Sequence, residues 1–189
     1  SSSTFLNGAG AYAAAGGGAW TLINSSVASN SASITITGLS NTYDSYVCIM
    51  SDIKPATWSS RMWIRLGDSS GIDSGSADYS WLDGSQQDST VNVSGNGADS
   101  EPHIRAGDCQ IDNGTGYSYS GKFTIHRSDV NQTYIVGDVA LIEYSGSKFM
   151  YASFSGRRKA VITVDRVQIL PSSGNITSGR MTVWGIKHT

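Results

Sequence analysis

Short runs in which apolar and polar residues alternate dominate the chain beyond its first 19 residues. Ile34 and Ile36 share one side of such a run, and Met62, Ile64 and Leu66 share one side of another. This period of two is typical of a β-strand with one buried face, and no stretch shows the 3.6-residue period of an amphipathic helix. The pattern therefore predicts an all-β fold.

Clusters of Gly, Ser, Asn and Asp separate these runs and predict turns between strands. The 22 glycines and the low share of charged residues, 15%, fit strands and turns better than helices. Antiparallel strands at this spacing indicate a two-sheet β-sandwich, jelly-roll-like, over residues 20–189, with long loops at 83–116. The expected strands are Trp20–Ile23, Ser31–Thr37, Ser45–Ile53, Arg61–Leu66, Tyr79–Leu82, Thr90–Val93, His103–Ile111, Tyr117–His126, Thr133–Tyr144, Lys148–Ser155, Lys159–Leu170 and Gly179–Lys187.

Residues 1–19 differ from the rest, because they are rich in Ser, Gly and Ala. So many glycines disfavour a helix, and the segment has too little apolar surface to fold alone. We therefore expect an extended N-terminal arm that is held by the body of the domain or by a neighbouring chain. Its assembly anchors are the isolated apolar residues Phe5, Leu6 and Tyr12, followed by Trp20.

The charge and the hydropathy of the chain exclude two classes of partner. The formal net charge is −2, so no basic surplus exists to bind phosphates, and we expect no nucleic acid partner. No apolar run approaches the roughly 20 residues that span a bilayer, so we expect no membrane insertion. No secretory signal is visible. The first residue is Ser1, and the sequence leaves open whether the chain is full length.

One short motif resembles that of a serine hydrolase. Gly67–Gly71 reads GDSSG and matches G-x-S-x-G. An active serine needs a general base and a strand-to-helix elbow, but more Gly, Ser and Asp follow here. The histidines His103, His126 and His188 are scattered along the chain. We interpret the motif as a turn and expect no catalytic residue, so that the protein is not an enzyme.

The sequence also offers no regular metal site. The loop Asp68–Asp78 is rich in aspartate but lacks the spacing of a calcium loop, and no Cys/His cluster has zinc spacing. We expect no metal and no cofactor. Cys48 and Cys109 lie far apart and do not form a disulfide framework. We interpret them as half-buried thiols, although the sequence alone does not decide whether they pair.

Arg and Trp residues gather on one predicted strand. Arg61, Trp63 and Arg65 share one side of that strand, opposite its apolar side, and Trp58 precedes them. Aromatic and arginine side chains are favoured anchors of interfaces and also stack on sugars. The alternative is a cation–π packing layer on the sheet. The sequence leaves both open, so these four residues are a candidate ligand or partner surface.

Both ends of the chain resemble a recurrent module of bacteriophage structural proteins. Ala19–Ile23 and Ala28–Ile34 are similar to its opening strands, with a Tyr-rich strand like Tyr43–Tyr46 after them. Ser172–Ile186 resembles its closing strand, which ends in an aromatic-Gly-Ile triplet. Phe5–Tyr12 is similar to the connector that joins fibre segments, but has Ala9 where Asp is usual. The resemblance is poor over residues 83–116.

This resemblance implies a virion structural protein on the particle surface, a β-sandwich that is usually trimeric and carries no catalytic residue. We expect a non-enzymatic fibre or tail-tip module, or a capsid decoration (cement) protein. The expected partners are other virion proteins of capsid or tail, further copies of the chain in a homotrimer, and a host surface glycan. The sequence leaves head or tail, the sugar and the symmetry open. The alternative is a secreted carbohydrate-binding module.

Overall fold

The computed structural model describes residues 4–6, 12–14, 20–88, 90–128, 130–143 and 148–187, and within them no side chains at 4–6, 12–14 and 90–94. Its elements are all β-strands: β1 (Thr4–Leu6), β2 (Tyr12–Ala14), β3 (Trp20–Val27), β4 (Ile34–Thr37), β5 (Ser45–Pro55), β6 (Met62–Asp68), β7 (Gly71–Ile72), β8 (Tyr79–Gln87), β9 (Thr90–Glu101), β10 (Ile104–Arg105), β11 (Tyr119–His126), β12 (Tyr134–Ile142), β13 (Phe149–Arg158), β14 (Arg166–Pro171) and β15 (Ile176–Ile186). Within these ranges, no helix is present that could cross a membrane.

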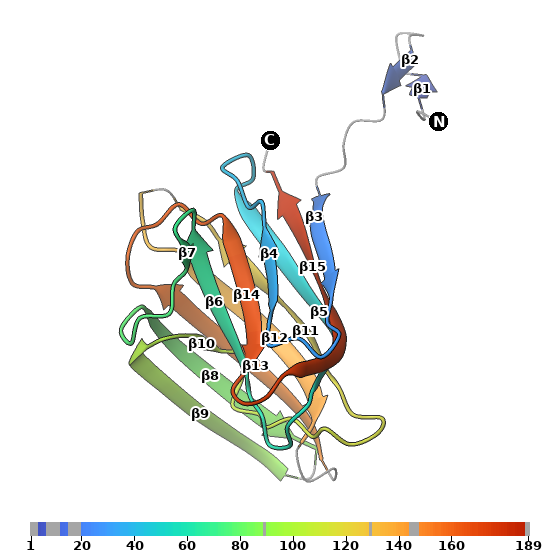
Figure 1. The fold of residues 1–189 in the computed structure, drawn as a ribbon, viewed down its shortest axis with the longest axis vertical. Helices are drawn as coiled ribbons and strands as arrows, with labels where there is room; N and C mark the ends of the chain where they lie inside the picture. The colour runs from blue at the N-terminus through green and yellow to red at the C-terminus, as the bar shows by residue number, and fades with distance from the viewer. Residues whose placement is uncertain are drawn as a thin grey trace.

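Two antiparallel sheets build the body of the protein (Figure 1). The larger sheet has eight strands in the order β3-β15-β5-β11-β12-β13-β8-β9. The smaller has five, in the order β10-β6-β14-β4 with β7 beside β6. The chain passes repeatedly between the sheets, so that β14 and β15 lie in different layers. The prediction of an antiparallel two-sheet sandwich is confirmed.

The core lies between the inward faces of the two sheets. Met62, Ile64 and Leu66 of β6 are buried, as the alternation predicts. Three tyrosines, Tyr46, Tyr79 and Tyr119, are also fully buried, and each hydroxyl has a partner, which for Tyr46 is the carbonyl of Ser40. The Tyr79 hydroxyl donates to the carbonyl of Leu66 over 2.9 Å, and the Tyr119 hydroxyl donates to that of Ala106 over 2.5 Å. These bonds remove the cost of burying the polar end of the ring.

The prediction of long loops at 83–116 is wrong at two dipeptides that are typical of turns, Asp83-Gly84 and Asn96-Gly97. Asp83-Gly84 lies inside β8, which runs on to Gln87, and Asn96-Gly97 lies inside β9. The Asp83 side chain faces the interior and binds Arg105 there, so a tertiary contact overrides the local turn preference. The predicted strand at Thr90–Val93 is the start of the longer β9.

Two other predicted strands are much shorter in the structure. Of His103–Ile111 only Ile104–Arg105 forms a strand, and of Lys159–Leu170 only the part from Arg166 does. The backbone of Lys159 bonds outside the sheet ladders, donating to Asp78 over 2.8 Å. Alternation in sequence therefore marked which residues face inward but overestimated how far these ladders extend.

The N-terminal segment forms a small hairpin of its own. β1 pairs with β2, with Leu6 opposite Tyr12, and this two-stranded sheet belongs to neither sheet of the body. The rest of residues 1–19 and the side chains of Phe5, Leu6 and Tyr12 lie outside the described residues. The role of these three as assembly anchors stays a prediction.

Candidate binding surfaces

The Arg-Trp-Arg side of β6 faces outward but is partly covered by the chain itself. The rings of Trp63 and His103 are stacked, with centroids 4.0 Å apart and planes at 16°. Arg65 Nε donates to the carbonyl of Pro102 over 2.9 Å, and Arg61 Nε lies 3.8 Å from Asp108. The segment before β10 therefore packs against this side of the five-stranded sheet.

Trp58 lies in the turn between β5 and β6 and is 54% exposed. The structure thus places the four predicted residues differently, since Trp63 and Arg65 contact the chain's own 102–103 segment and Trp58 lies in a turn. The ring that stacks on Trp63 is the imidazole of His103. The role of the four as a partner surface stays a prediction.

A buried ion-pair network lies behind this surface and joins the two sheets. Arg105 of β10 binds Asp83 of β8 through Nε at 2.6 Å and Nη2 at 3.0 Å, and its Nη1 lies 3.1 Å from Asp108. The guanidinium also lies over the Trp81 ring, 4.2 Å from its centroid. Burial raises the pKa of Asp83, and the bonds to Arg105 oppose that rise. The network joins β10 to β8, and its charged groups pair with one another.

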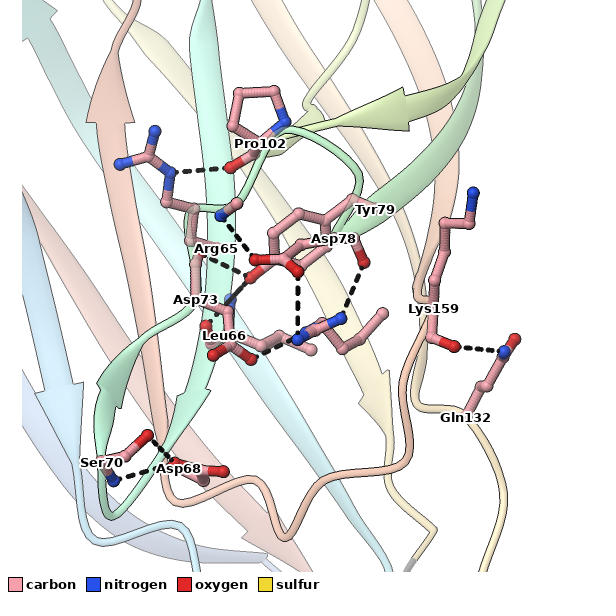
Figure 2. A network of polar contacts seen from close by, with 12 residues as sticks. Arg65, Leu66, Asp68, Ser70, Asp73, Asp78, Tyr79, Pro102, Gln132 and Lys159 are labelled. Atoms are coloured by element: carbon pink, nitrogen blue, oxygen red, sulfur yellow. Dashed lines mark hydrogen bonds and ion pairs between the residues drawn. The ribbon is translucent and has the colours of Figure 1, made fainter.

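A second network holds the aspartate-rich loop (Figure 2). Arg158 of β13 binds the carboxylates of Asp73 at 2.7 Å and Asp78 at 3.2 Å, and it lies over the Tyr79 ring. The carboxylates that suggested a cation loop therefore face an arginine. In the described part of the chain, no group of three or more His, Cys, Asp or Glu side chains forms a metal site.

The GDSSG motif forms the tight turn between β6 and β7, where Gly67 pairs with Ile72. The Ser70 hydroxyl donates to Asp68 Oδ1 over 2.6 Å, and the Ser70 amide bonds the same oxygen over 2.8 Å (Figure 2). These bonds lower the pKa of Asp68 and stabilise the turn. A strand follows the motif instead of the helix that a nucleophile elbow requires, so it has the structure predicted for a turn.

Both cysteines are buried free thiols. Burial raises the pKa of the Cys48 thiol far above its usual range, and burial with Asp108 nearby raises that of Cys109 to about 12. The structure therefore answers the open question of pairing, because the two do not form a disulfide. They are also more deeply buried than the half-buried state that we expect from the sequence.

The largest exposed apolar surface is on the eight-stranded sheet, on the side turned away from the core. We call this side the outer face. Nine of the twelve large apolar side chains that are strongly exposed among the described residues lie on it. They are Trp20, Leu22, Val27, Ile49, Leu82, Tyr134, Val136, Phe149 and Tyr151. Polar side chains such as Lys122 and Asp138 lie among them, but so many large exposed apolar side chains on one face indicate an interaction surface.

One half of the outer face is hollowed. A groove of about 660 Å³ crosses β9, β8, β13 and β12. Leu82, Tyr134 and Val136 give it apolar walls, while Arg157 and Asp99 contribute charges. Gly97 keeps it open, since a Cβ there would come within 2.6 Å of the Leu82 side chain. The opposite half of the face carries Trp20 and Trp184, so that one half is hollow and the other is bulky.

Of the residues on this face, only Trp20 belongs to a site predicted from the sequence. A signal was present, because several strands are apolar at consecutive positions instead of alternate ones. Phe149-Met150-Tyr151 and Tyr134-Ile135-Val136 are examples, in which the middle residue is buried and its two neighbours are exposed. A strand with one solvated face should carry polar residues at those outer positions. Apolar residues at the outer positions of these two segments indicate that this part of the outer face is made for contact.

Comparisons with known proteins leave the family of this chain open. No family model matches the chain, and no curated protein matches it. Among solved structures it is similar to CG-16, a homodimeric agglutinin from chicken liver, with 14% sequence identity and a TM-score of 0.25. That match covers 71% of this chain and 98% of the agglutinin. A likeness at this level supports no statement on function.

Proposed function

We propose that this chain is a non-enzymatic structural module on the surface of a phage particle, a fibre or tail-tip module or a capsid decoration protein, and that its outer face is a surface through which it assembles in the particle. The observation that carries the proposal is the concentration of exposed apolar side chains on that face. The resemblance of the chain ends to phage structural modules names the kind of assembly.

The energetics favour a surface that is covered in the working state. Fully burying an exposed Leu or Val side chain is worth roughly 1.5–3 kcal/mol, and the nine apolar side chains of the outer face are still 36–65% exposed, so covering them favours association. The body below it is a sandwich whose layers are joined by buried ion pairs such as Arg105–Asp83. A firm sheet offers its side chains to a partner with little loss of conformational entropy on binding.

The test is to look for the chain in particles. Phage particles purified from cultures that encode this chain are analysed by mass spectrometry, and antibodies to the chain are applied to intact particles for immunogold electron microscopy. We expect the chain at a fixed copy number per particle, with gold on the exterior. Complete particles that lack the chain would refute the proposal. The position of the gold distinguishes capsid from tail.

The groove favours a second candidate function, the binding of a carbohydrate. Tyr134 offers an aromatic ring at its wall, and Arg157, Asp99 and Ser80 offer hydrogen-bonding groups beside it. This combination would suit a host glycan for a fibre module or the ligand of a secreted carbohydrate-binding module. A glycan array with the wild-type chain and the Tyr134→Ala variant tests this. Binding that is lost in the variant supports the candidate, and no binding to any glycan refutes it.

A further inference from the structure

The outer face carries complementary halves, and we propose that it binds a second copy of this chain in a two-fold symmetric, face-to-face dimer. The inference deepens the proposed function and rests on its assignment of the outer face as an assembly surface. It replaces the homotrimer that the resemblance implies with a dimer, because the arrangement of this face fits a two-fold axis. In the dimer, the bulky half of one copy, with Trp20, Leu22, Trp184 and Ile186, covers the groove of the other.

Strand register defines which residues lie in one row across the face. From one sheet edge to the other, neighbouring pairs in the ladders connect Leu22, Trp184, Val47, Thr124, Val136 and Ser155 and then reach Leu82 and Gly97. The row runs perpendicular to the strands through both halves of the face. It begins with large side chains and ends at the groove.

Consider a two-fold axis that runs parallel to the strands, in the plane between the two copies and above the boundary of β11 and β12. Rotation about this axis places the bulky half of one copy against the groove half of the other. Because β11 and β12 are the two central strands of eight, the rotation places β15 over β8 and β3 over β9. Trp184 of one copy then lies over Leu82 of the other, and Leu22 lies over Gly97, where no side chain projects. Such self-complementarity is what a two-fold interface requires, since each contact occurs twice.

The charges at the centre of the face obey the same symmetry. Lys122 and Asp138 are register partners on β11 and β12, and their side chains lie 3.8 Å apart. Both are exposed, the lysine by 66% and the aspartate by 36%. The two-fold rotation exchanges β11 with β12, so each lysine meets the aspartate of the second copy. Opposite charges therefore face one another across the axis. A dimer whose axis is displaced by one strand would lose this pairing, so the charges favour the axis between β11 and β12.

The face is large enough for a stable dimer. Eight strands at the usual spacing cover about 34 Å, and eight residues of strand extend about 26 Å, so the face covers about 900 Å². A standard interface takes about 800 Å² from each partner. Two sheets that pack face to face with their strands nearly aligned, as within a sandwich, satisfy this requirement.

The oligomeric state of the whole 189-residue chain tests the proposal, by sedimentation velocity and by size exclusion with light scattering across micromolar concentrations. We expect a dimer for the wild type. Leu82→Lys, which places a charge in the groove, should weaken dimerisation at least tenfold. The matched control is Val161→Lys, an exposed valine outside the face, which should leave the dimer unchanged. A wild-type monomer or trimer, or a dimer that Leu82→Lys does not weaken, overturns the proposal.

A charge exchange tests the position of the axis without a change of apolar surface. Lys122→Asp places four carboxylates at the centre of the dimer and should weaken it several-fold, while the combined Lys122→Asp and Asp138→Lys variant should restore it. Circular dichroism melting curves check that each variant folds. An unchanged dimer in the single variant contradicts the two-fold placement. A dimer that is absent from particles refutes the proposed function alone, and a monomer that is found on particles refutes the dimer alone.

Discussion

The outward faces of the two sheets differ in polarity, although side chains point alternately inward and outward along the strands of both. On the five-stranded sheet, Trp63 stacks on His103, and Gln168 Nε2 donates to the Thr35 hydroxyl over 3.0 Å. On the eight-stranded sheet, Leu82 is 65% exposed and Val136 is 53% exposed. On the five-stranded sheet, other groups of the same chain contact the outward side chains, and we call this side the completed face. The outer face of the eight-stranded sheet is left with large exposed apolar side chains. Alternation thus determines which residues point outward, but the remaining chain determines whether anything covers them.

Replacing Arg105 should have the largest effect on the free energy of unfolding. Arg105 joins β10, at the edge of the five-stranded sheet, to Asp83 of β8 in the other sheet. Arg105→Ala leaves the carboxylate of Asp83 buried without its partner. We expect the free energy of unfolding to fall by about 3–5 kcal/mol. Urea denaturation measures this, with Arg180→Ala at an exposed position as control. Equal stabilities of the two variants would contradict a structural role for the network.

Truncation of one tryptophan on each face sharpens the comparison. Trp63→Ala removes the ring that stacks on His103 and should lower the free energy of unfolding by about 2 kcal/mol. Trp20→Ala, at a side chain that is 49% exposed, should change it by less than about 0.5 kcal/mol at protein concentrations that disfavour association. Thermal unfolding of both variants at low concentration measures the difference. A larger loss for Trp20→Ala would reverse our view of the two faces.

The free energy of unfolding should fall in acid because His103, which stacks on Trp63, is buried in its neutral form. Burial, with Arg65 and Arg105 nearby, lowers the pKa of His103 from 6.5 to about 4 in the folded chain. Between these values the unfolded chain binds the extra proton, so stability falls as the pH drops from about 6.5 towards 4. The loss by pH 4 should be about 3 kcal/mol. Denaturation of the wild type and of His103→Gln across this range isolates it, since the variant should lack this part of the slope.

The smallest effect on the free energy of unfolding is expected when a polar and an apolar side chain of similar shape are exchanged between the two faces. Val136→Thr keeps the β-branched shape on the outer face and should change the free energy of unfolding by less than about 0.5 kcal/mol. It should nevertheless elute earlier in hydrophobic-interaction chromatography. Thr35→Val, on the five-stranded sheet, should elute later. Identical retention of both variants would show that the difference between the faces has no consequence in solution.

The fold could be predicted from the sequence because it depends on local periodicity. The alternation around Met62, Ile64 and Leu66 identified the buried side of a strand correctly. The predicted strands Thr133–Tyr144 and Lys148–Ser155 also correspond to a real pair, β12 and β13, and the amide of Glu143 donates to the carbonyl of Lys148 over 2.9 Å beside them. The turn predicted at Asp83-Gly84 was wrong because its aspartate is bound by Arg105, which lies in a different sheet and which local signals do not reveal.

The candidate surfaces were harder to predict, because exposure is a property of the assembled sheets. Arg61, Trp63 and Arg65 do point outward, but sequence gave no means to see that the 102–103 segment would pack on two of them. The groove depends on Leu82 and Tyr134, which are far apart along the chain. Only Trp20 belongs both to the predicted residues and to the outer face.

The state of the two thiols has a consequence for the environments that the fold tolerates. Thiol–disulfide exchange requires a thiolate that a partner can reach, and Cys48 and Cys109 are almost fully protonated at neutral pH and inaccessible to solvent. The described fold therefore contains no disulfide that a reducing medium could break, and its two thiols are withheld from an oxidant in solution as long as the chain stays folded.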